Sequence, residues 1–209
     1  MLDEGVIKFN FAQFEKIAPL DPQEIEDVDK ARSALFDLNL IGEYLPEKIG
    51  FGNISLKKDY RSLKETNNPQ FIISGTQTGA KARLEGQDYT RVLDFNLDDQ
   101  SVWCQGPVKA SSESLTHAAI YLCDSKINAV IHIHNRIIWD EMQREGYPAT
   151  AKDTSYGTKE MALEVEGLIK SRGASEIVMS GHEDGVLIFA QTMEEALKRT
   201  LELHAKFLK

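Results

Sequence analysis

Apolar residues recur every three or four positions in several stretches of the chain, which predicts amphipathic helices. The first begins at Asp21-Pro22, a capping residue followed by a proline suited to a first turn, and is expected to stop near Gly42. Another follows the serines at 111–114, which suit an N-cap. Three more are expected over residues 137–145, 158–172 and from Thr192 to about Phe207.

Short apolar or alternating runs between these helices predict strands. The pattern of Ile7, Phe9 and Phe11 gives a strand or extended arm over 6–11, and two glycines near 50 lead into a strand-like run that by itself reads as a hairpin turn. Further strands are expected at 71–73, 92–95, 101–104, 127–134, 176–179 and 186–189. Strands mixed with helices predict one α/β domain over residues 1–209.

Residues 127–134 read as a buried strand that carries two histidines. Successive strand side chains point to opposite faces, so His132 and His134, two positions apart, share a face. Imidazoles are costly to bury without partners, and a metal ion is one common partner. A pair of this kind by itself is more typical of a structural or surface position, so the metal interpretation depends on the rest of the chain.

Composition limits the functional classes. The net charge of −9 argues against nucleic acid and acidic membranes as partners. No run approaches the roughly 18 apolar residues of a membrane span. Cys104 and Cys123 are the two cysteines, without a CxxC spacing, which favours a reducing, cytoplasmic setting.

A third histidine could complete a metal site. His182 lies in a glycine-flanked turn between two expected strands, whereas His117, inside a helix, and His204 read as structural or surface residues. Three neutral nitrogen ligands leave a coordination position open for substrate or water. Such a metal could polarise an oxygen and stabilise an enediolate, with Glu113 as general acid/base.

The loop Ser74–Gly79 follows an expected strand and is rich in glycine, serine and threonine. Backbone N–H groups and hydroxyls in such a loop can hold an anion, although the GxxxxGK[ST] pattern of a P-loop is absent. The helix after the serines would also expose N–H groups at its start. Each feature alone is a weak indication of an anion site.

Four motifs together make the chain resemble the class II aldolase/adducin family, the type that contains fuculose-phosphate aldolase and ribulose-phosphate 4-epimerase. They are GNIS at 52–55, ISG at 73–75, SSE followed by H..IY at 111–121, and AVIHIH at 129–134. A YGT segment at 156–158 and the GH…TMEEAL ending at 181–197 follow in the family's order.

The resemblance implies a three-layer α/β/α sandwich with a largely antiparallel central sheet. It implies a divalent metal, most often Zn²⁺ with Mn²⁺, Co²⁺ or Fe²⁺ as alternatives, on His132, His134 and His182, and it implies Glu113 as the acid/base residue. It also implies a homotetramer with sites at subunit interfaces. The residues that it places around a substrate phosphate are Asn53, Ser74, Gly75, Ser111 and Ser112.

The expected function is therefore a metal-dependent aldolase-type lyase in carbohydrate metabolism, acting on a hydroxylated, phosphorylated sugar through a metal-stabilised enediolate. A sugar-phosphate epimerase or dehydratase on the same site, and a non-catalytic adducin-like binding module, are the alternatives. The loop after ISG departs from the family pattern, which leaves the substrate open. Glu183 and Asp184 intervene between His182 and Gly185, also unlike the family, and are expected to reshape the pocket. The tyrosine that the aldolases supply from a neighbouring subunit has no clear match in this sequence, and Tyr156 is a candidate for it.

Overall fold

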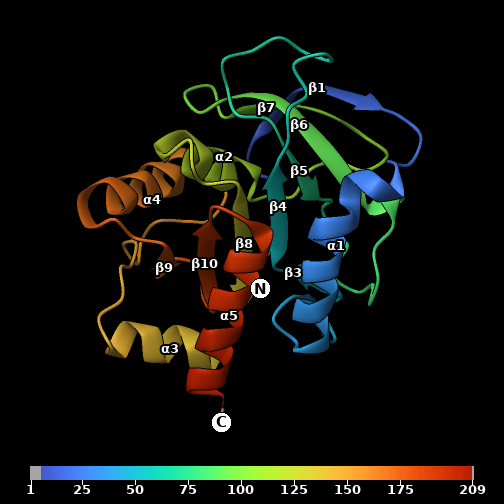
Figure 1. Ribbon diagram of the computed structural model, residues 1–209. Coiled ribbons are helices and arrows are strands. Elements are labelled where there is room, and N and C mark those ends of the chain that lie inside the picture. The colour runs from blue at the N-terminus through green and yellow to red at the C-terminus, as the bar shows by residue number, and fades with distance from the viewer. Residues whose placement is uncertain (1–5, 209) are drawn as a thin grey trace.

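An eight-stranded sheet forms the middle layer of the computed structural model, which describes residues 6–208 (Figure 1). The strand order is β1-β7-β6-β5-β4-β8-β10-β9, and neighbours are antiparallel except β1 and β7, which are parallel. The strands are β1 (Asn10–Lys16), β4 (Asn53–Lys57), β5 (Phe71–Ser74), β6 (Tyr89–Asn96), β7 (Ser101–Gly106), β8 (Ala129–His134), β9 (Glu176–Val178) and β10 (Gly185–Ala190).

Helices cover both faces of this sheet, so the expected three-layer sandwich with a mostly antiparallel sheet is confirmed (Figure 1). Each face has its own hydrophobic cluster. One cluster contains side chains of α1 (Pro22–Asp37), α3 (Arg136–Arg144) and α5 (Met193–Phe207). The other contains side chains of α2 (Ser114–Cys123) and α4 (Lys159–Arg172). Within the described residues, no helix is long and apolar enough to span a bilayer.

The central strand β8 is buried along its whole length. Ile131 and Ile133 pack into the cluster under α1 and α5, and Val130 packs into the cluster under α2 and α4. By strand alternation, His132 and His134 lie on the Val130 face, toward the end of the strand. Both histidines are therefore built into a fully buried strand of the sheet.

A small hairpin stands apart from the main sheet. It pairs β2 (Gly42–Tyr44) with β3 (Ile49–Phe51), and Gly52, with a φ of +71°, turns the chain from β3 into β4. Gly50 thus belongs to the hairpin, and Gly52 connects the hairpin to β4. The hairpin also packs against the loop after β5, because a Cβ on Gly79 would lie 1.9 Å from the carbonyl oxygen of Gly42.

Three expected boundaries were wrong. The N-terminal strand covers Asn10–Lys16 rather than 6–11, because its pairing with β7 begins at Asn10 and a register shift after Phe11 breaks the simple alternation. The first helix ends at Asp37 rather than near Gly42, since Asn39 takes the left-handed backbone conformation that stops it.

The third concerns the start of α2. The N-cap position is Glu113, which makes no side-chain capping bond, and the serines at 111 and 112 precede it. The helix start is held instead by Ser114, whose backbone N–H and hydroxyl both donate to the carbonyl oxygen of Ser111. The side chain of Glu113 is thereby left for another role.

Candidate active site

Three histidines from two parts of the chain converge at the end of β8. The ring of His182, in the turn between β9 and β10, lies 5.2 Å from the ring of His132 and 4.6 Å from that of His134. The Nε2 atoms of His132 and His134 are 2.9 Å apart. Each of the three residues offers one nitrogen, and these nitrogens all lie within 4.8 Å of one another.

Glu113 lies beside this cluster and is only 2% exposed. Its Oε2 accepts a hydrogen bond of 3.0 Å from the hydroxyl of Thr116, one turn later in α2. Its Oε1 has no hydrogen-bond partner and lies 4.0 Å from Nε2 of His182. A buried carboxylate oxygen without a partner is unusual in a folded protein and marks a place where a ligand can bind.

Burial sets the protonation states of these groups. It lowers the pKa of His132 to about 4, and it lowers the pKa values of His134 and His182 well below their ordinary range, so all three are neutral at pH 7. Burial raises the pKa of Glu113 to about 7, against the opposing effects of the Thr116 hydrogen bond and of Lys8.

These residues fit a divalent metal ion. Neutral imidazole nitrogens are the form in which histidine binds a metal, and three of them with an adjacent carboxylate form a donor set of the catalytic zinc type. The Nδ1–H of His132 can donate to the carbonyl oxygen of Val186 at 3.2 Å, which leaves its Nε2 lone pair toward the cluster. The candidate donor atoms thus already lie within 4.8 Å of one another.

The predicted anion-site residues lie together with one exception. Asn53, Gly75, Ser111 and Ser112 line a small pocket that is closed on another side by the 76–79 loop. Oδ1 of Asn53 is buried there without a hydrogen-bond partner. Ser74 does not line the pocket, and its hydroxyl accepts from the backbone N–H of Ile54 at 3.3 Å.

The acids after His182 both contact Arg136. Glu183 is exposed and forms an ion pair with Arg136 at the start of α3, and Oδ1 of Asp184 lies 3.6 Å from the same guanidinium. These contacts attach the turn that carries His182 to the start of α3. Neither acid lines the small pocket, and a reshaping of the metal pocket by them stays a prediction.

Sequence reasoning missed two neighbours of the histidines. The hydroxyl of Tyr44 lies 2.9 Å from Nδ1 of His134. Nζ of Lys8 lies 3.8 Å from the centre of the Tyr156 ring, and that ring in turn is 4.5 Å from the ring of His182. Tyr156, expected as a candidate, is therefore at the site, whereas nothing in the local patterns around residues 8 and 44 marks them.

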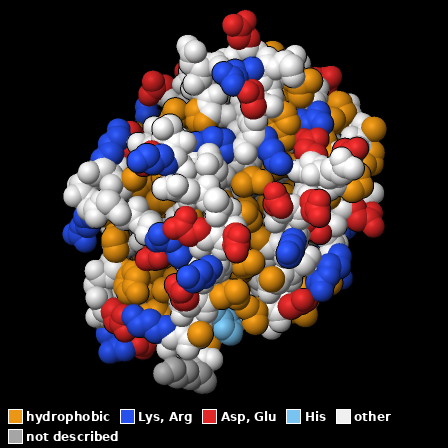
Figure 2. Space-filling view, viewed as in Figure 1, with side chains coloured by type: hydrophobic (Ala, Val, Ile, Leu, Met, Phe, Trp, Pro, Cys, Tyr) orange, Lys and Arg blue, Asp and Glu red, His pale blue; other side chains and the backbone are white. Residues whose placement is uncertain are grey.

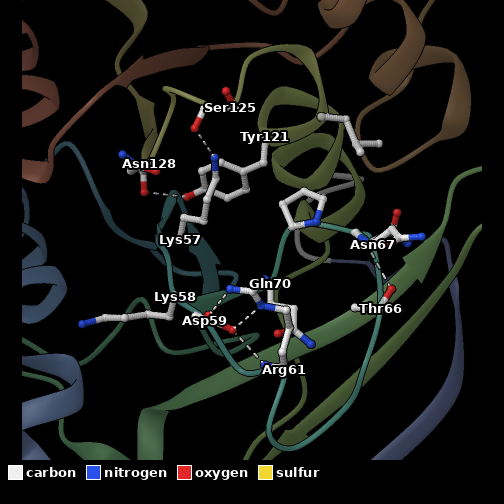
Figure 3. A pocket seen from close by; sticks show the side chains of 13 residues that line it. Lys57, Lys58, Asp59, Arg61, Thr66, Asn67, Gln70, Tyr121, Ser125 and Asn128 are labelled. Carbon is white, nitrogen blue, oxygen red and sulfur yellow. Dashed lines mark hydrogen bonds and ion pairs between the residues drawn. The ribbon is translucent and has the colours of Figure 1, made fainter.

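A larger pocket, of about 620 Å³, lies at the opposite end of β4 (Figure 3). Lys57 reaches there toward the carbonyl oxygen of Ser125, while Lys58 points away. The pocket contains none of the predicted site residues. On the face seen in Figure 2, acidic and basic side chains are interspersed rather than gathered by sign, so this face offers no basic patch for nucleic acid.

Acidification of the metal-free protein is expected to lower its free energy of unfolding. Between about pH 6.5 and 4, the unfolded chain protonates histidines that the folded chain keeps neutral, so protons favour unfolding. Glu113 acts in the opposite direction, because its folded carboxyl, with a pKa of about 7, retains a proton that the unfolded carboxyl releases near 4.5.

Glu113→Gln removes this opposing contribution, so the loss of stability between pH 6.5 and 5 should deepen by about 1 to 2 kcal/mol relative to the unchanged protein. Urea unfolding in the presence of a chelator measures the difference. An equal loss in both proteins would contradict the raised pKa of the buried carboxyl.

The comparisons with known proteins agree with this architecture. The sequence model of one protein family, the class II aldolase and adducin N-terminal domain, matches residues 47–207 of this chain. A search of curated protein sequences found no significant match.

Three solved structures illustrate the likeness of the fold. L-fuculose-1-phosphate aldolase from Thermus thermophilus is 23% identical, with a TM-score of 0.59 and 88% of each chain covered. A sugar-phosphate aldolase from Thermotoga maritima is 17% identical, with a TM-score of 0.63 over 88% of this chain and 91% of that one. YgbL from Klebsiella pneumoniae, a candidate aldolase, epimerase or decarboxylase, is 17% identical, with a TM-score of 0.64 over 88% and 86%. With the match of the family model over most of its length, this chain belongs to the class II aldolase and adducin N-terminal domain family.

Proposed function

We propose that this protein is a divalent-metal-dependent lyase of the aldolase type, which cleaves or forms a carbon–carbon bond in a hydroxylated, phosphorylated sugar. One observation carries the proposal. The buried Oε1 of Glu113 has no partner and lies 4.0 Å from a histidine of the three-histidine cluster. A general acid/base next to a prospective metal site is the arrangement that such a reaction needs.

A metal ion held by His132, His134 and His182 would supply Lewis-acid polarisation of a substrate oxygen and stabilisation of the negative charge that develops on it. Glu113 would take a proton at its Oε1 and return it. Burial raises the pKa of Glu113 to about 7 in the metal-free protein, and the positive charge of a bound metal ion would lower it again, toward the ionised form that accepts a proton. The Thr116 hydroxyl holds the other carboxylate oxygen and so fixes the direction of Oε1.

The small pocket beside Glu113 supports a phosphorylated substrate. Ser111 and Ser112 precede Glu113 directly, so an anion held by them would place the rest of the substrate next to the carboxyl. The amide of Asn53, on the strand paired with β8 opposite His132, faces the same pocket. The cavity is only about 20 Å³, room for about one water molecule. The 76–79 loop would therefore open to admit a phosphate group.

The alternative functions share much of this site. An epimerase or a dehydratase would use the same metal and carboxyl and differ in the bond that changes. A non-catalytic adducin-like module would need neither, and the burial of a carboxylate oxygen without a partner beside three neutral imidazoles is costly for a protein that only binds a partner. Zinc as the metal, assembly as a homotetramer and a cytoplasmic location remain predictions that follow from the resemblance and the composition.

Glu113→Gln should retain the fold and the bound metal while kcat falls at least about a hundredfold, because the amide cannot transfer the proton. Release of dihydroxyacetone phosphate from a panel of hydroxylated ketose 1-phosphates measures the activity. Glu183→Gln is the matched control and should leave kcat unchanged, since that neighbouring acid is exposed and pairs with Arg136. A Glu113→Gln protein with turnover near the original value would remove Glu113 from the mechanism, and epimerised or dehydrated products would favour the alternative reactions.

Ser112→Ala should raise KM for the phosphorylated substrate about tenfold or more, because it removes a hydroxyl from the proposed phosphate pocket. It should change kcat little, because the proposed acid/base residue Glu113 is unchanged. The same sugar without its phosphate should react equally well with both proteins. Ser125→Ala, at an exposed serine outside the pocket, serves as the control. Parallel losses for both substrates would show that the pocket does not bind the phosphate group.

A further inference from the structure

Tyr44 reaches the histidine cluster from outside the main sheet. It lies at the end of β2, in the small hairpin, and its hydroxyl is 2.9 Å from Nδ1 of His134. The two rings meet edge to face with their centres 6.1 Å apart. No motif of the family resemblance includes this residue, and the two partners are 90 positions apart in the sequence.

The hydrogen-bond partners of the two β8 histidines determine which nitrogen of each can bind a metal. An imidazole that binds a metal through Nε2 carries its proton on Nδ1, and that N–H needs an acceptor. For His132 the acceptor is the carbonyl oxygen of Val186. For His134, once a metal takes its Nε2, the hydroxyl oxygen of Tyr44, 2.9 Å from Nδ1, is the group placed to be that acceptor.

The surroundings hold the Tyr44 ring in place. Its centre is 4.4 Å from that of Phe51, across the hairpin, and the Phe51 ring is itself 5.6 Å from the ring of His134. Gly42 allows this packing, because a Cβ there would lie 2.9 Å from the Phe51 ring. This packing holds the Tyr44 side chain so that its hydroxyl lies next to His134.

We propose that Tyr44 is a positioning residue for metal binding: by accepting the Nδ1–H of His134, it holds that imidazole in the tautomer and orientation that present Nε2 to the metal. The inference rests on the proposed function, since it presupposes a metal on the three histidines. It assigns Tyr44 no contact with substrate. Its consequence is that the small hairpin, and not only the sheet, sets the affinity of the site.

Tyr44→Phe tests this directly, because it deletes the hydroxyl and keeps the ring. Loss of a hydrogen-bonding partner of a ligating histidine typically weakens metal binding by about 10- to 100-fold. The dissociation constant for Zn²⁺, measured by competition with a chromophoric chelator, should therefore rise by that factor. Tyr89→Phe is the matched control: it also removes a tyrosine hydroxyl, one that donates to Asp29 at 3.0 Å, and it should leave the zinc affinity unchanged.

A second measurement separates positioning from a general loss of stability. In zinc-loaded protein labelled with ¹⁵N-histidine, the Nδ1–H of His134 should give a slowly exchanging proton signal. In Tyr44→Phe this signal should be lost or exchange much faster, while the signal of the His132 Nδ1–H, held by Val186, stays in place. Thermal unfolding of both metal-free variants shows whether their folds are equally sound.

The possible outcomes separate a failure of the positioning role of Tyr44 from a failure of the proposed metal site. If the unchanged protein binds zinc and Tyr44→Phe binds it equally tightly with the His134 signal intact, the positioning role is wrong and the metal site stands. If Tyr44→Phe and Tyr89→Phe weaken zinc binding to the same extent, the effect is one of stability and the positioning role is again wrong. If the unchanged protein binds no divalent metal, the proposed function itself fails.

Discussion

The burial of three imidazoles and one carboxyl in a single place is the constraint on which the site depends. Polar groups removed from water destabilise a fold unless each has a partner. Most of these atoms have one: Val186 accepts from His132, Tyr44 meets His134, and Thr116 donates to Glu113. Oε1 of Glu113 lacks a hydrogen-bond partner and lies beside the proposed metal site, and Oδ1 of the nearby Asn53, which also lacks one, lies at the proposed substrate pocket. The residual cost thus falls on atoms that a ligand would satisfy.

The sheet makes this burial possible. Strand β8 lies between β4 and β10, and His132 pairs with both neighbours. His134 pairs with β10 alone, and its backbone N–H donates to the carbonyl oxygen of Leu40. Gly185 pairs with His134, and its lack of a side chain is essential, because a Cβ there would lie 2.7 Å from Cδ2 of His182. The same register places Asn53 opposite His132. The three-histidine cluster and the pocket beside Asn53 are therefore adjacent products of one strand pairing.

Much of this arrangement could be predicted from the sequence. Alternation in 127–134 placed the two histidines on one face, and the capping residues Asp21 and Thr192 marked helix starts that the structure confirms. The family motifs predicted the layered fold, which no periodicity in a single chain specifies. The strand order could not have been derived from local patterns, because pairing depends on contacts between distant segments.

The contributions of single residues that tertiary packing brings to the site could not be predicted from the sequence. Tyr44 sits in a short hairpin whose glycines read as an ordinary turn, so nothing predicted that its hydroxyl would meet a histidine 90 positions away. The side-chain direction of Ser74 was also hidden: it belongs to the ISG motif, yet its hydroxyl bonds to the backbone of β4. Such details follow from register and rotamer, which sequence patterns do not encode.

The central claim is that the three histidines hold a catalytic metal ion, and metal content tests it most directly. We would reconstitute the protein with zinc, manganese or cobalt, remove unbound ions, and count metal per chain by mass spectrometry, next to the His132→Ala, His134→Ala, His182→Ala triple variant. The account predicts about one ion per chain for the unchanged protein and none for a folded variant. An unchanged protein without metal, or a variant that keeps a full equivalent, would contradict it.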